Sequence, residues 1–126
     1  MYRCVLSAIA AACLVAPAVA QAQRNFPQAA LRGSMQVGNP PEVVLNGQPA
    51  HLSPGVRIRG ANNMLLLSGT LAGQKLLVHY TLDFTGMVKD VWILTPHEAK
   101  KNPWPATPYE AQSWRFDAVA QTWAKP

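Results

Sequence analysis

Short apolar runs alternate with turn residues along most of the chain. From Arg32 onward, Gly, Pro and Asn separate these runs at intervals of about ten residues, a pattern typical of all-β proteins. Asn46-Gly47 predicts a tight hairpin, because both central residues of a type I′ turn need positive φ. Met64–Leu67 is apolar throughout, which predicts a buried strand. The expected strands are residues 32–37, 42–45, 48–52, 56–59, 64–67, 75–83, 87–95, 115–117 and 122–124.

Two Thr-Pro sequences near the C-terminus predict short helices. Thr95-Pro96-His97-Glu98 is a capping box, and Thr107-Pro108-Tyr109-Glu110 repeats the pattern. We therefore expect a mainly β fold with two short capped helices near the C-terminus. A small, partly closed barrel or rolled antiparallel sheet, OB-like or SH3-like, fits best, because closing a sheet removes its exposed edges.

Residues 1–22 have the pattern of a signal peptide that is removed. A positive start at Arg3 precedes the apolar run Val5–Val15, which is too short to span a bilayer, and small residues near Ala20 and Ala22 provide cleavage sites. A competing lipoprotein pattern would instead anchor the chain through a lipid on Cys13. We expect a periplasmic or secreted protein. Its residues 23–31 should form a loose leader, and residues 32–126 a single β-rich domain.

The cysteine content excludes several classes of site, whereas the net charge leaves two interpretations open. Both cysteines, Cys4 and Cys13, lie in the expected signal peptide, so the mature chain should contain no disulfide, cysteine nucleophile or thiolate metal site. The net charge of +5 falls to about +4 once Arg3 is removed. This mild positive charge suits either a soluble domain or one that meets anionic polymers or lipid head groups.

The remaining polar residues form no catalytic or metal-binding motif. The three histidines are isolated from one another, whereas metal ligands usually cluster, so we expect no metal and no cofactor. Glu98 and Glu110 are explained by helix capping, and Asp83 and Asp117 by turns. Asp90 is the exception, a carboxylate within a strand, and we expect it to pair with an arginine across the sheet.

Arg57 and Arg59 are the first candidate binding residues. In a strand, Val56 and Ile58 face one side while the two arginines face the other. That alternation also describes an ordinary strand with one solvated face. Two guanidinium groups on one face are equally suited to bidentate binding of a phosphate or carboxylate, and both interpretations stay open.

The second candidates are three aromatic residues near a Pro-rich segment, Trp104, Tyr109 and Trp114. They are suited to stacking on a sugar ring or a peptide. Alternatively, Trp104 and Trp114 cover the open end of the barrel, because large aromatic residues dominate small cores. Nucleic-acid binding would need a basic groove interleaved with aromatics, and export argues against it, so we expect none.

Three segments resemble small exported proteins of proteobacteria for which no activity is established: LNGQPAHLSPGVRIRGANN (Leu45–Asn63), VKDVWILTPHEA (Val88–Ala99) and FDAVAQTWAKP (Phe116–Pro126). The resemblance implies export and one domain, and it supplies no site residues. We predict a monomeric, non-catalytic envelope module without a transmembrane span that binds an anionic polymer or lipid head group. The alternatives are a structural partner or assembly factor docking on another envelope protein, and a hydrolase with an unrecognised site.

Overall fold

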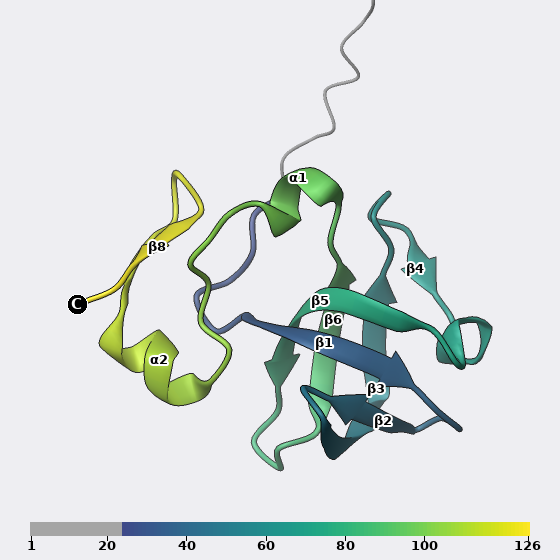
Figure 1. Cartoon of the computed structure of the whole chain (residues 1–126). Coiled ribbons are helices and arrows are strands. Elements are labelled where there is room, and N and C mark those ends of the chain that lie inside the picture. The colour runs from purple at the N-terminus through teal and green to yellow at the C-terminus, as the bar shows by residue number, and fades with distance from the viewer. Residues whose placement is uncertain (1–23) are drawn as a thin grey trace, which may run out of the picture.

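Residues 24–126 are described by a computed structural model of the chain. The expected signal peptide, residues 1–22, and the candidate lipidation site Cys13 lie outside the described residues. The described part is mainly β, and its strands form a barrel beside a smaller C-terminal lobe (Figure 1).

Five strands close the barrel. They pair in the order β2-β1-β5-β6-β3, and a further pairing between β2 and β3 completes the circle. Every pair is antiparallel except β3 with β6, which run parallel. The expected class, a small β-barrel with two short helices, is therefore confirmed, and the barrel is fully closed. Its strands are β1 (Leu31–Val37), β2 (Glu42–Leu45), β3 (Gln48–Arg59), β5 (Lys75–Leu82) and β6 (Val88–Ile93).

The strand order identifies the type of barrel. β1 lies between β2 and β5, which is the fourth barrel strand along the chain. β3 runs parallel to β6, which is the fifth. This is the arrangement of the OB barrel rather than that of the SH3-like alternative. Because one barrel type hosts many unrelated functions, the arrangement by itself assigns no ligand.

The long strand β3 corrects the first of two sequence predictions. Ser53-Pro54-Gly55 was expected to turn the chain between two strands, but it lies inside β3. The pairing with β6 shifts register between Leu52 and Arg57, so the Pro and Gly occupy a bulge instead of a turn. β3 pairs with β2 along its first half and with β6 along its second.

The apolar run Met64–Leu67 corrects the second prediction. It contains the short strand β4 (Leu65–Leu66), but all four side chains are exposed, by 37 to 77%. β4 pairs only with Ile58 and Arg59 at the end of β3. The five-stranded barrel closes without it, so β4 lies outside a core that is already complete. A 3₁₀-helix, η1 (Ser68–Leu71), connects β4 to β5.

The barrel interior forms the main hydrophobic core. Alternate residues of each strand point inward, as the two-residue period of a strand requires. The largest fully buried members come from β1, β5 and β6 and are Met35, Val37, Val78, Val88 and Val91.

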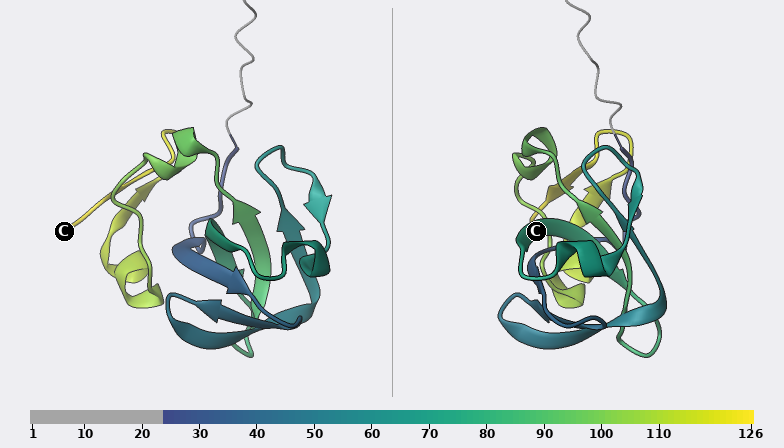
Figure 2. Two further views of the ribbon diagram at one scale, coloured as in Figure 1. Left: turned by 45° about the vertical axis from the view of Figure 1, so that its right-hand side comes forward. Right: turned by 90° about the vertical axis from the view of Figure 1, so that its right-hand side faces the viewer.

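The C-terminal lobe packs on one side of the barrel (Figure 2). It contains α2 (Pro108–Ser113) and the hairpin β7 (Arg115–Asp117) and β8 (Thr122–Ala124), and α1 (Pro96–Ala99) follows β6 at the end of the barrel. Both predicted caps are present, because Thr95 accepts a hydrogen bond from the backbone N–H of Glu98 and Thr107 from that of Glu110.

A second hydrophobic cluster joins the lobe to the barrel. Phe26 and Ala30 are buried in it together with Trp104 and Trp123. Two residues of the expected loose leader, residues 23–31, are therefore packed against the domain before β1 begins. The burial of Phe26 and Ala30 holds this segment between the barrel and the lobe.

Candidate functional site

The predicted arginine face is present on β3. Val56 and Ile58 pack toward the core, Arg57 is exposed and Arg59 is half-buried. The expected ion pair with Asp90 is absent. Although Asp90 lies opposite Arg57 in the parallel register, its carboxylate accepts a hydrogen bond from the Thr81 hydroxyl at 3.1 Å instead. Among residues 24–126 the single ion pair joins two other residues, Arg24 and Glu98.

The exposed apolar run lies directly beside Arg59, two residues along β3 from Arg57. Leu65 is the register partner of Arg59, and Leu66 is that of Ile58. We call the surface made by Arg57, Arg59 and Met64–Leu67 the β4 face. Sequence reasoning identified its two arginines but missed its apolar half, because it assigned Met64–Leu67 to the core.

The three candidate aromatics have different environments. Trp104 is buried in the second hydrophobic cluster, and its indole N–H donates to the carbonyl of Ala30 at 3.0 Å. Tyr109 is 77% exposed on α2. Trp114 is half-buried, with the Lys125 ammonium 5.4 Å from the centre of its ring. The aromatic rings in contact with Trp104 are those of Phe26, His79, Phe116 and Trp123. Neither Tyr109 nor Trp114 is among them.

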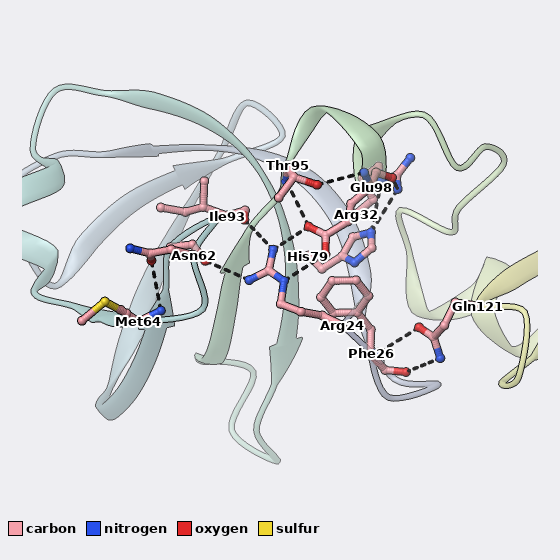
Figure 3. A network of polar contacts seen from close by, with 11 residues as sticks. Arg24, Phe26, Arg32, Asn62, Met64, His79, Ile93, Thr95, Glu98 and Gln121 are labelled. Atoms are coloured by element: carbon pink, nitrogen blue, oxygen red, sulfur yellow. Dashed lines mark hydrogen bonds and ion pairs between the residues drawn. The ribbon is translucent and has the colours of Figure 1, made fainter. Parts of the chain in front are cut away.

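A buried charge network at the end of the barrel was not anticipated (Figure 3). The Arg24 guanidinium donates to the Glu98 carboxylate at 2.9 Å, and also to the carbonyls of Gly60 and Ile93, each at 2.8 Å. Glu98 in turn accepts from the backbone N–H of Thr95. Burial alone would raise the pKa of Glu98, but the hydrogen bonds from Arg24 and Thr95 outweigh it and hold the pKa below its ordinary value.

A second arginine, Arg32 of β1, binds the histidine in the same network. Its guanidinium donates to Nε2 of His79 at 3.2 Å and to the backbone carbonyls of Glu98 and Lys101. An arginine can only donate, so Nε2 is the acceptor and the proton of the neutral ring sits on Nδ1. Burial, followed by the charges of Arg32 and Arg24, lowers the pKa of His79 to about 2. The ring also stacks on Trp104 at 4.1 Å.

A pocket of about 300 Å³ opens above this network. It lies where the leader, the turn at residues 61–63, β5, α1 and the C-terminal hairpin meet, and we call it the junction pocket. Its floor combines the Arg24–Glu98 pair with aromatic rings. Residues that face it include Arg24, Phe26, Asn62, His97, Lys101 and Trp104.

The sequence does not reveal this site, because each of its residues fits an ordinary local pattern and its partner in the site lies far away along the chain. Glu98 was identified, but as a helix cap; its second partner Arg24 lies 74 positions earlier. His79 and Arg32 each occupy an ordinary strand pattern, and their contact spans 47 positions. The capping glutamate gave no signal of the pair, because a capping carboxylate is normally satisfied by backbone N–H groups at the helix start.

No protein-family model, curated protein or solved structure matches the chain. The geometry of the two surfaces is therefore the basis for any function. Within residues 24–126 no group of three or more His, Cys, Asp or Glu side chains is placed to hold a metal ion. No helix of the described part is long and apolar enough to cross a membrane.

Proposed function

We propose that the protein is an exported, non-catalytic module that binds the surface of an anionic phospholipid membrane through the β4 face. The observation that carries the proposal is the exposure of four consecutive apolar side chains next to two outward arginines. Contiguous exposed apolar surface on a soluble domain marks an interaction site. Here it lies on a strand that the barrel does not need.

The pattern of exposure favours a lipid surface over a protein partner. Successive side chains of an extended segment point in opposite directions, and Met64, Leu65, Leu66 and Leu67 are exposed by 64, 66, 37 and 77%. A flat protein surface would cover only one side of such a segment. The hydrocarbon boundary of a bilayer surrounds an inserted segment and contacts both sides. β4 itself is only two residues long, so its backbone offers little for pairing with a partner strand.

Charge around the β4 face fits an anionic head-group layer. The stretch from Val43 to Leu82 contains three basic residues, Arg57, Arg59 and Lys75, and no acidic residue. Across the sheet, Asp90 of β6 lies opposite Arg57 but forms no ion pair with it. Basic residues near an anionic bilayer contribute about 1 kcal/mol each. A shallow apolar contact and a few cations are each weak, but together they hold a protein at a membrane surface.

Vesicle co-sedimentation tests the proposal directly. The mature protein should sediment with vesicles containing phosphatidylglycerol, bind at least tenfold more weakly to pure phosphatidylcholine, and be released as salt is raised. Leu65→Ser/Leu67→Ser and Arg57→Gln/Arg59→Gln should each weaken binding to the anionic vesicles at least tenfold. Phe84→Ser is the matched control, because Phe84 is a fully exposed apolar residue outside the β4 face.

Two results would contradict this function. One is equal sedimentation of the wild type and the double-serine variant with anionic vesicles. The other is saturable binding to a soluble anionic glycan with no binding to vesicles, which would support the polymer hypothesis instead. Circular dichroism of each variant checks that the barrel is intact, as expected for substitutions of exposed residues.

A further inference from the structure

The junction pocket has an apolar wall of aromatic rings. Phe26 and Trp104 meet edge to face with their ring centres 6.0 Å apart, and both face the pocket. The pocket is at the small end of the range of ligand sites, which is about 300 to 1,000 Å³. An apolar wall in a pocket of this size suits one small ring.

Hydrogen-bond donors that the fold does not use surround this wall. The Nη1 group of Arg24 carries two N–H bonds, and one is used by the carbonyl of Gly60. The Lys101 ammonium has three, and one donates to the carbonyl of Ala120 at 3.0 Å. The side-chain oxygen of Asn62 accepts from the backbone of Met64, while its amino group has no partner within the described residues. Within residues 24–126, three side chains, those of Arg24, Lys101 and Asn62, therefore retain donors for a ligand.

The carboxylate in the pocket is already occupied. Glu98 is the one acidic residue in the pocket lining, and its carboxylate accepts three hydrogen bonds, two from Arg24 and one from Thr95. The charge of Arg24 offsets that of Glu98, so Lys101 leaves the lining with a net positive charge. A ligand that supplies acceptors and a negative charge is therefore favoured over a neutral or cationic one.

We propose that the junction pocket binds a compact ring that bears a single carboxylate, with the ring against Phe26 and Trp104 and the carboxylate toward Lys101, Arg24 and Asn62. Buried aromatic walls with a few convergent polar groups are the usual construction of small-molecule sites. The pocket adjoins the β4 face, because Asn62 accepts a hydrogen bond from the backbone of Met64, but no residue of the β4 face lines it.

Benzoate and its neutral analogue benzamide test the proposal, using the mature protein and titration calorimetry. Benzoate should bind saturably, and benzamide at least tenfold more weakly, because only the former has the charge. Lys101→Gln should weaken benzoate binding at least fivefold. Lys100→Gln is the matched control, because it removes the neighbouring exposed lysine, which does not line the pocket.

A second measurement separates loss of binding from loss of structure. Of the four tryptophans, Trp104 alone lines the pocket within the described residues. In two-dimensional ¹H–¹⁵N spectra, benzoate should shift the Trp104 indole signal of the wild type and leave that of Trp114 in place. Equal affinity for benzoate and benzamide, no saturable binding of benzoate, or shifts centred on Trp114 would each overturn the proposal. Binding of inorganic phosphate in preference to benzoate would also overturn it, because phosphate needs no ring wall.

Discussion

The buried, uncharged His79 should make the protein unusually sensitive to mild acid. The structure places it 1% exposed between Arg32 and Trp104, with a pKa lowered from 6.5 to about 2 by burial and by the two nearby arginines. An unfolded chain protonates this histidine near its ordinary value. Between these two values the unfolded state therefore binds one proton more than the folded state, and stability is lost as the pH falls below about 6.5.

The expected size of this effect follows from proton linkage. Each pH unit in that window changes the free energy of unfolding by about 1.4 kcal/mol. From pH 7 to pH 5 the loss is about 2 kcal/mol, a large fraction of the stability of an ordinary domain. Glu98 adds to the loss only as the pH approaches and falls below its ordinary value of 4.5, because its pKa is lowered.

Urea unfolding followed by tryptophan fluorescence at pH 7, 6 and 5 measures the effect. His79→Gln keeps an acceptor for Arg32 but cannot titrate, so its stability should be nearly constant over this range, although lower at pH 7 because the stacking on Trp104 is changed. His51→Gln, which alters an exposed histidine, should retain the wild-type pH dependence. A wild type that is equally stable at pH 7 and pH 5, or a His79→Gln variant that follows the wild-type curve, would refute the reasoning.

Two further substitutions test the packing around the barrel. Arg24→Met should lower the free energy of unfolding by about 3 kcal/mol, because it leaves the buried Glu98 carboxylate without its cation. The control Arg57→Met, on the exposed face, should change the free energy of unfolding by less than about 0.5 kcal/mol. Equal effects of the two substitutions in urea unfolding would contradict the assignment of the ion pair. Gly33→Ala should lower the free energy of unfolding by about 1 to 3 kcal/mol. The added Cβ would lie 2.9 Å from the Asn46 amide and 3.0 Å from the Tyr80 ring. An unchanged melting temperature would show that both side chains move aside freely.

Local sequence signals predicted the elements that depend only on local geometry. Asn46 and Gly47 have φ of 53° and 80°, as the predicted hairpin turn requires. The threonines that start α1 and α2 cap them as expected. In each case the deciding interaction joins residues within four positions of one another, so the sequence window contains all of its partners.

The errors arose where a distant partner decides the outcome. Pro54 and Gly55 are common turn residues, but the parallel neighbour β6 holds them in a bulge of one long strand. Met64–Leu67 has the composition of a core strand, yet the barrel interior is filled by other strands, which leaves this run exposed. Neither outcome is visible in the sequence alone, because the first depends on which strand pairs with β3 and the second on which strands fill the barrel interior.

The different environments of the arginines show why the site could be predicted only in part. Arg32 and Arg57 occur in similar alternating strand patterns. A buried guanidinium needs acceptors, and α1 together with the link that follows it provides Arg32 with the carbonyls of Glu98 and Lys101. β6 brings Asp90 opposite Arg57, but within residues 24–126 neither Arg57 nor Arg59 forms an ion pair. Arginines that form no ion pair within the fold are those that an anionic partner can reach, so the β3 arginines remain the residues to test first for surface binding.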